Sequence, residues 1–376
     1  MAEHYPLQTT PLHSLHQDHQ AKLVQFAGYE MPVHYAPGII KEHLHTRSKA
    51  GLFDVSHMGQ IRVVGEDIAA QLENQIPADL VGLAAGRQKY GLLLNLQGGI
   101  LDDLMVINRG DHFVLIVNAA CKHQDLALLK SELGNTLQFE MMENLALIAL
   151  QGPEAADVLS KSVSQPDQNI NRMKFMDVQN LELAGFPCMV SRSGYSGEDG
   201  FEISLAAEHA PNLAKAFLGH DSVDLAGLGA RDSLRMEAGL CLYGQDLDSE
   251  TTPIEAGLKW AISPPRRAGG AREGGFPGAD IILDQILQGT KRKLVGLLPE
   301  GRAPMRTGTQ LFDQNSNPVG SITSGGFSPS LGHPVSMGYV NTALSAADTL
   351  LQAEVRGKLL PVSVTTLPFV SHQYAR

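Results

Sequence analysis

The chain has 376 residues and a formal net charge of −11, from 29 basic and 40 acidic side chains. Hydrophobic residues make up 43% of it and charged residues 18%, which is typical of a globular protein with a sizeable core. This length predicts two or three domains. The acidic balance argues against a nucleic-acid binder, whose surface would be basic, and no apolar stretch approaches the length of a membrane span.

The N-terminal residues Met1–Pro11 resemble neither a secretory signal nor an arginine-rich transit peptide. We therefore expect a cytoplasmic protein, or a mitochondrial matrix protein whose presequence has been removed. Three widely spaced cysteines, Cys121, Cys188 and Cys241, predict neither a disulfide framework nor a zinc site. Their apolar neighbours indicate small buried side chains in a reduced compartment.

The N-terminal two thirds of the chain alternate between helical and strand patterns. In chain order we first expect a turn-rich lead at Gly28–Pro37, a helix at Lys41–Ala50, a strand at Gly59–Val64 and a helix at Asp67–Gln75. Next come strands at Gly91–Leu94, Leu104–Ile107 and His112–Val117, and a helix at Lys122–Glu132. The last elements are a strand at Ala146–Gln151, a helix at Pro153–Ser160, strands at Met189–Arg192 and Phe201–Ser204, and a helix at Asp232–Ala238 that starts near Arg231. This alternation predicts an antiparallel or mixed sheet covered by helices.

A proline- and glycine-rich stretch, Ser263–Pro277, is the clearest boundary in the sequence. After it come short strand patterns at Lys293–Leu298, Gln310–Phe312, Val319–Thr323, Val335–Tyr339, Leu350–Val355 and Leu360–Thr365. Turn residues separate them at short intervals, which favours a small β-barrel or sandwich.

Several familiar site motifs are absent. The sequence has no glycine-rich phosphate loop and no Gly-x-Ser-x-Gly nucleophile elbow. His43 and His45 are two residues apart on an expected helix, so their rings point apart. We interpret them as part of a solvated helix face and not as metal ligands.

Three polar clusters lie among small or apolar residues. The first contains the adjacent carboxylates Asp102 and Asp103, which in a strand point to opposite faces, so that one can face solvent and the other a cavity. The second, Ser193–Glu202, combines glycines with acidic residues. The third, Gly227–Gly239, places an arginine and an aspartate near a helix start. Taken singly, each cluster also fits a structural role as a turn cap, an acidic hairpin or a capped helix.

In order along the chain, however, these clusters and their flanking blocks are similar to those of the aminomethyltransferase family, also called glycine cleavage T-protein. The matching blocks are Thr10–Leu12, Phe26–Pro32, Leu52–Met58, Gly98–Val106, Ala149–Pro153, Gly194–Glu202, Gly227–Gly239, Leu242–Asp246, Thr323–Pro329 and Pro368–Val370. The chain departs at Ser196, where relatives usually have threonine, and Arg266–Gly275 has no clear counterpart.

The resemblance implies an α+β fold with three domains in a clover-leaf arrangement and a C-terminal β-barrel. We expect a discontinuous folate-binding domain at 1–55 plus 140–262, an α+β domain with the Asp-Asp pair at 56–139, and the barrel at 278–376. The implied reaction transfers a methylene carbon from the aminomethyl-lipoyl arm of the H-protein to tetrahydrofolate. It releases ammonia and forms 5,10-methylenetetrahydrofolate, with no metal involved.

The resemblance also assigns the site residues. The essential acid is the second carboxylate of the pair, Asp103, while Asp102 would point away and only support the turn. Folate contacts fall on Glu202, Arg231, Tyr374, Tyr90, Asn118 and Tyr195. Two rival functions are a tetrahydrofolate-dependent demethylase and a non-enzymatic folate-binding accessory protein. The Asp103 and Leu242–Asp246 blocks follow the glycine-cleavage branch, and the accessory protein's lysine–glycine–cysteine signature is absent.

Overall fold

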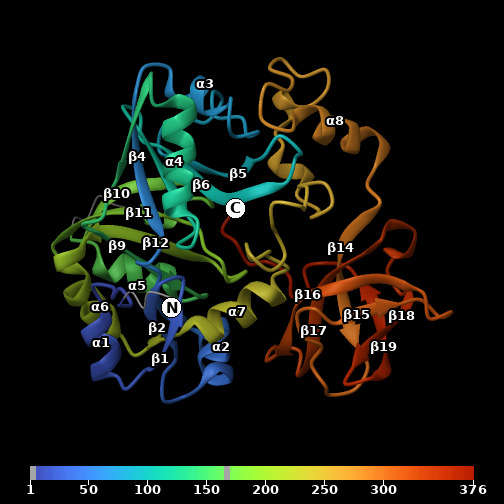
Figure 1. The fold of residues 1–376 in the computed structure, drawn as a ribbon. Coiled ribbons are helices and arrows are strands. Elements are labelled where there is room, and N and C mark those ends of the chain that lie inside the picture. The colour runs from blue at the N-terminus through green and yellow to red at the C-terminus, as the bar shows by residue number, and fades with distance from the viewer. Residues whose placement is uncertain (1–5, 165–169) are drawn as a thin grey trace.

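The computed structural model describes residues 6–164 and 170–376, and it shows two open sheets, a closed barrel and a small hairpin (Figure 1). The first sheet has six strands in the order β10 (Val178–Leu183), β11 (Phe186–Ser191), β12 (Gly200–Ala206), β9 (Leu145–Gln151), β3 (Ala50–Asp54) and β13 (Val223–Leu225). All neighbours are antiparallel except β13 and β3. The sheet is therefore mixed.

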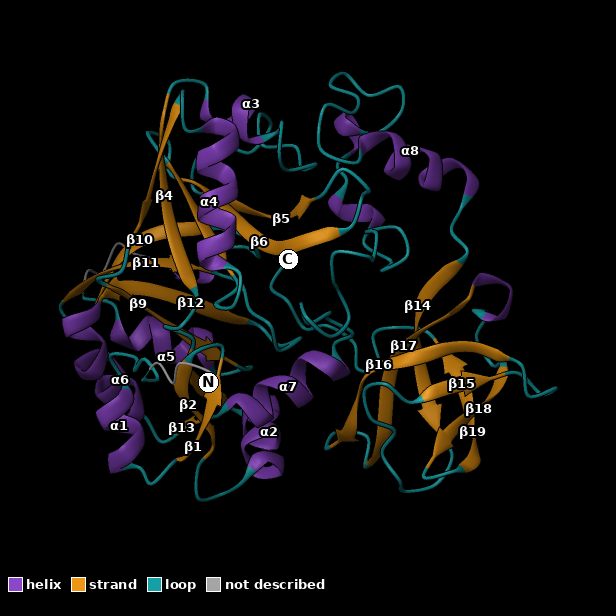
Figure 2. Cartoon of the chain, in the orientation of Figure 1, coloured by secondary structure: helices purple, strands orange, loops and turns teal. Residues whose placement is uncertain are grey.

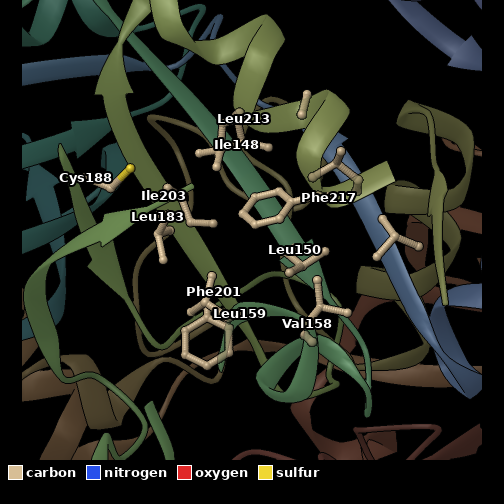
Figure 3. Packing of buried hydrophobic residues seen from close by; sticks show 14 of the residues in the cluster. Ile148, Leu150, Val158, Leu159, Leu183, Cys188, Phe201, Ile203, Leu213 and Phe217 are labelled. Carbon is tan, nitrogen blue, oxygen red and sulfur yellow. The ribbon is translucent and has the colours of Figure 1, made fainter. Parts of the chain in front are cut away.

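Helices accompany this first sheet, as Figure 2 shows. They are α1 (His13–Asp18), α2 (Ile39–Ser48), α5 (Ala155–Ser162), α6 (Ala210–Leu218) and α7 (Leu228–Glu237), together with the hairpin β1 (Lys22–Phe26) and β2 (Tyr29–His34). The core between sheet and helices contains Phe201 and Ile148 from the strands and Phe217 from α6, all with no exposed surface (Figure 3). Burial of such side chains drives this unit to fold.

The second sheet has five antiparallel strands in the order β5 (Arg87–Leu94), β6 (Ile100–Asn108), β7 (Phe113–Val117), β4 (Gly59–Gly65) and β8 (Leu137–Met141). Helices α3 (Ile68–Leu72) and α4 (Lys122–Leu133) pack on one face of it. The opposite face meets the first unit in a shared apolar cluster that includes Ile107, Ile116, Leu147 and Leu234. The two sheets therefore share an interface.

The C-terminal strands close into a six-stranded barrel in the order β14 (Arg292–Pro299), β17 (His333–Asn341), β16 (Pro318–Ser328), β15 (Gln310–Phe312), β18 (Leu350–Val355) and β19 (Lys358–Thr365). Helix α8 (Ala279–Gln288) precedes it. After β19 the chain runs back to the middle of the molecule (Figure 1), where the Gln373 amide donates to the carbonyl of Gly197, 2.8 Å away. The C-terminal tail therefore joins the barrel to the first unit.

The predicted fold class, α+β with a C-terminal barrel, is confirmed. Some details differ from the sequence prediction. Helix α7 begins at Leu228 and not near Arg231, since Gly227 directly precedes it as its N-cap. Helix α5 begins at Ala155, so Pro153 lies before it. The turn-rich lead contains the hairpin strand β2. The boundaries predicted for the three domains stay a prediction.

The expectation of a solvated helix face around His43 is wrong. His43 on α2 has no exposed surface; its Nδ1 lies 2.8 Å from the Ser233 hydroxyl, and its Nε2 lies 3.1 Å from a Glu237 oxygen. The two partners are on α7, 190 residues or more further along the chain. Sequence spacing shows which side of a helix a residue occupies but not what packs on that side.

Candidate active site

The two adjacent carboxylates lie on β6, where burial alternates from residue to residue. Asp102 has no exposed surface, and it shares the α4-covered face with the buried Leu104 and Val106. Asp103 is half-buried on the opposite face. The expectation that one carboxylate of the pair faces solvent is therefore wrong for Asp102, because a helix covers its side of the sheet.

One side chain, Asn118, contacts both carboxylates. It follows the end of β7, the neighbour of β6 in the sheet. Its Nδ2 donates to Asp102 Oδ1 at 2.8 Å and to Asp103 Oδ1 at 2.9 Å, and its backbone N–H donates to Asp102 Oδ2 at 3.1 Å. A single amide thus fixes the two carboxyl groups relative to each other.

Tyr90 lies beside Asp103 on the same face of the sheet, because its β5 position pairs with Met105, two residues from Asp103. Its hydroxyl hydrogen-bonds the Asp103 side chain. Burial, followed by the charge of Asp103, raises the pKa of Tyr90 well above its usual value, so the phenol keeps its proton. The ring also packs on Trp260 with the ring centres 5.0 Å apart, and this tryptophan is 58% exposed.

The surroundings of Asp103 change its acidity. Burial and then the neighbouring charge of Asp102 raise the pKa of Asp103 to about 7, although hydrogen bonds from Tyr90 and Asn118 oppose the rise. A carboxyl group with a pKa near neutrality can both accept and release a proton at the pH of the cell. Asp103 is therefore suited to proton transfer.

Arg231 and Tyr195 form a second part of the site. The Arg231 guanidinium lies 4.9 Å from the centre of the Tyr195 ring, and the Tyr195 hydroxyl donates to the backbone carbonyl of Cys241. Within the part of the chain that the structure describes, the guanidinium has no hydrogen-bonding partner. Burial lowers the pKa of Arg231, while the charge of Glu202 opposes that change. Guanidinium donors without partners in such surroundings are suited to bind an acceptor on a ligand.

Glu202 lies on β12, between Ser191 on β11 and Ala149 on β9. The Ser193 hydroxyl donates to its Oε2 at 3.1 Å. The negative charge of Glu202 favours the protonated form of the Arg231 guanidinium. A strand that is paired on both sides holds this carboxylate at a fixed position beside the arginine.

Tyr374 lies against different residues. Its ring stacks on Phe175, with the ring centres 4.2 Å apart and the planes 9° apart, and on its other neighbour His372 at 4.8 Å. Burial raises the pKa of Tyr374 to about 12. The structure thus brings six of the seven predicted residues into one connected group, in which the charges of both Asp103 and Arg231 act on Tyr195. The seventh residue, Tyr374, lies in the adjoining C-terminal tail.

An ion pair between Arg235 and Asp246, to which the sequence assigns no role, supports this group of six residues. Arg235 on α7 has 1% exposed surface; its Nη1 donates to Asp246 at 2.8 Å and its Nη2 to the Ser324 hydroxyl on the barrel at 2.9 Å. The pair spans the loop that carries Cys241, whose carbonyl accepts from Tyr195. Arg235 lies in the matching block Gly227–Gly239 and Asp246 in the block Leu242–Asp246. Their presence in these blocks is the sequence feature that could have indicated a role for them.

Among the described residues, no group of three or more His, Cys, Asp or Glu side chains is arranged to hold a metal ion. The expectation that no metal takes part in the reaction stays a prediction. No helix in the described ranges is both long and apolar enough to cross a membrane.

Comparison with known proteins shows the family of the chain. A GCVT N-terminal domain matches residues 12–265, and a glycine cleavage T-protein C-terminal barrel domain matches residues 292–371. The chain belongs to the glycine cleavage T-protein family. Its activity is that of an aminomethyltransferase of the glycine cleavage system, and neither rival function is favoured.

Several members of the T-protein family are similar to the chain over nearly its full length. The mitochondrial aminomethyltransferase of Dictyostelium discoideum is 43% identical over 98% of this chain and 94% of its own length, and that of Homo sapiens is 42% identical over 98% and 91%. The crystal structure of glycine cleavage system aminomethyltransferase T from Bartonella henselae is 43% identical, covers 98% of this chain and all of its own, and has a TM-score of 0.91. The predicted resemblance is confirmed.

Proposed function

We propose that the chain transfers a methylene carbon to tetrahydrofolate from the aminomethyl group on the lipoyl arm of the H-protein. In this reaction the bonds from the carbon to its amino nitrogen and to the lipoyl sulfur break, and bonds to N5 and N10 of the folate form. The two protons on the folate nitrogens end on ammonia and on the lipoyl thiol, which gives 5,10-methylenetetrahydrofolate and the dihydrolipoyl H-protein. The proposal needs no metal, nucleic acid or membrane.

Asp103 is the proposed catalytic residue. Its carboxylate orients the N10 proton, accepts it as N10 attacks the methylene carbon, and passes it to the leaving ammonia. The negative charge also stabilises the cationic carbon in the transition state. The observation that carries this proposal is the position of Asp103, whose carboxyl group is held by both Tyr90 and Asn118 next to the charged Asp102; these surroundings raise its pKa to about 7.

Glu202 and Arg231 are the proposed pterin contacts. A carboxylate accepts hydrogen bonds from the N–H groups of a pterin, and a guanidinium donates to its oxygen or ring nitrogens. The donors of Arg231 have no partner among the described residues, which fits a ligand at this position. Tyr90, Asn118 and Tyr195 would surround the rest of the folate, and Tyr374 would reach it from the C-terminal tail.

The place of the reaction in the cell follows from the partner. Relatives such as the Dictyostelium discoideum protein are named mitochondrial. We propose that the enzyme acts in the cytoplasm, or in the mitochondrial matrix if a presequence is removed. In either place it would act together with the lipoylated H-protein.

The test is a direct assay. The purified protein is incubated with tetrahydrofolate and aminomethylated H-protein, and ammonia and 5,10-methylenetetrahydrofolate are measured together. We expect both products in equal amounts. If neither forms while folate still binds, the chain is a folate-binding protein without this activity, and the proposal is wrong.

A further inference from the structure

A third carboxyl group, that of Asp125, lies behind the candidate active site. It is in the first turn of α4, the helix that packs on the Asp102 side of β6, beside β4 and β6 in Figure 1. Asp125 has no exposed surface, and α4 is held there by Leu129 and Leu133, which pack in one cluster with Leu104 of β6. Its helix therefore fixes the Asp125 carboxyl group against the sheet.

Asp125 lacks the partners that an ionised carboxylate needs. Both of its oxygens are buried, and neither accepts a hydrogen bond from a described donor. The side chain that it does reach is another carboxylate, that of Asp102. An ionised group here would have no compensating donor and would also face a like charge, which is costly in a buried position.

Asp102, in contrast, has several donors. It accepts hydrogen bonds from the backbone and side-chain nitrogens of Asn118, at 3.1 and 2.8 Å, and its side chain also meets the thiol of Cys121. When two carboxyl groups meet in a buried site, the group with fewer donors keeps the proton. Here that group is Asp125, which can then donate its hydrogen to Asp102.

We propose that Asp125 is a positioning residue for the reaction: its protonated carboxyl group donates a hydrogen bond to Asp102, which holds the Asp102 carboxylate in place next to Asp103. This inference rests on the proposed role of Asp103. Asn118 is the second link, since its Nδ2 contacts both Asp102 and Asp103. Burial and then the charge of Asp102 raise the pKa of the catalytic carboxyl group of Asp103.

The electrostatics agree with this arrangement. Burial and then the contact with Asp102 raise the pKa of Asp125 to about 10, above the value of about 7 for Asp103. The other titratable groups around these three carboxyls are Cys121 and Tyr243 near Asp102 and Asp125, and Tyr90, Tyr195 and Cys241 near Asp103. All five have raised pKa values and are uncharged at neutral pH, so none of them supplies a positive charge that would ionise Asp125.

Two matched variants test the donated hydrogen bond. Asp125→Asn keeps a donor of similar shape, so it should retain most of the kcat and the wild-type pH profile. Asp125→Leu removes the donor, so the Asp102 carboxylate loses a hydrogen bond that fixes it next to Asp103, its effect on Asp103 weakens, and the pKa of Asp103 falls. We expect kcat to fall about tenfold, the acid limb of the pH profile to move to lower pH, and the KM for folate to stay within about twofold. A folded Leu variant with wild-type kcat and profile, or an Asn variant as impaired as the Leu variant, would overturn the inference.

Infrared spectroscopy provides a test that does not depend on the Leu variant folding. At about pH 8.5, above the pKa of about 7 for Asp103 and below that of about 10 for Asp125, the wild-type protein should show a protonated carboxyl band that Asp125→Asn lacks. Absence of this band from the wild-type spectrum would refute the inference. The measurement needs no folate or H-protein, so its result is independent of whether the proposed reaction occurs.

Discussion

Two carboxylates of this protein, the fully buried Glu237 and the half-buried Asp103, differ in their surroundings. Glu237, at the end of α7, has no exposed surface and is surrounded by donors: Arg47 Nη2 at 2.9 Å, the Ser328 hydroxyl at 2.6 Å, and the Ser330 hydroxyl and backbone N–H at 2.7 and 3.0 Å. His43 adds a contact at 3.1 Å. Asp103 has Asn118 and Tyr90 as donors, and the charged Asp102 beside it.

These surroundings shift the pKa values of Glu237 and Asp103 in opposite directions. Burial by itself would raise both pKa values. For Glu237, the contacts with His43 and the serines outweigh burial and lower the pKa to about 2. For Asp103, the charge of Asp102 adds to burial, and the pKa rises to about 7. Because many hydrogen-bond donors surround Glu237, its carboxylate stays ionised and joins two helices to the barrel. Because few donors surround Asp103, its carboxyl group can exchange a proton.

The largest effect should come from Asp103→Asn, which preserves shape but removes the charge and the proton acceptor. We expect kcat to fall about a hundredfold or more, and folate affinity to change by less than about threefold. Initial rates give kcat, and quenching of the single tryptophan, Trp260, which packs on Tyr90, gives the affinity. Asp111→Asn, an exposed change in a loop of the same sheet, is the control. Retained turnover in Asp103→Asn would refute the catalytic role.

Glu237→Gln tests the other side of the comparison. It removes the buried carboxylate that pairs with Arg47 Nη2 and leaves that guanidinium with only Glu198 as a charged partner, so the free energy of unfolding should fall by about 3 kcal/mol. Because the folded pKa of Glu237 lies below its usual 4.5, the stabilisation that it provides is complete above about pH 4.5 and is lost as pH falls towards about 2.

Denaturant unfolding measured from about pH 3 to pH 7 shows whether the difference between wild type and Glu237→Gln shrinks in acid. Asp157→Asn, which breaks an exposed pair with Lys161, is the control and should change stability by less than about 1 kcal/mol. Equal stability of the Glu237 variant and wild type at neutral pH would contradict the structural role.

Glu202→Ala should weaken folate binding first, because the N–H donors of the pterin would lose their acceptor. We expect the Kd for tetrahydrofolate to rise about tenfold, with a smaller change in kcat at saturating folate. Tryptophan fluorescence again measures the binding. Glu140→Ala on the exposed side of β8 is the matched control. A wild-type Kd in the Glu202 variant would count against the pterin contact.

Asp102→Asn should lower kcat at least as much as Asp125→Leu does, about tenfold, and should have the clearest effect on pH dependence. Since the ionised form of Asp103 is the active one, kcat/KM should fall in wild type as pH drops through about 7. Removing the neighbouring charge lowers the pKa of Asp103, so the acid limb should move down by about one pH unit. Pre-steady-state rates from about pH 5 to pH 9 measure this shift. A rate loss equal to that of Asp103→Asn would mean that both carboxylates act directly.

The sequence by itself determined the family, the α+β class with its C-terminal barrel, and the identity of the candidate residues. Runs of matching blocks place Asp103, Glu202 and Arg231 in the chain, and strand spacing predicts the barrel. Alternation along β6 also indicates correctly that Asp102 and Asp103 point to opposite faces. These features are local, so they can be read without knowing how the segments pack.

Only the tertiary structure decided what lies opposite each of those faces. The burial of Asp102 depends on α4, and the burial of His43 depends on α7, whose Glu237 lies 194 residues away in sequence. The position of Tyr374 depends on a tail that runs back from the barrel to Gly197 and Phe175. A side chain's acidity depends on the donors, charges and solvent around it, and packing brings these from distant parts of the chain.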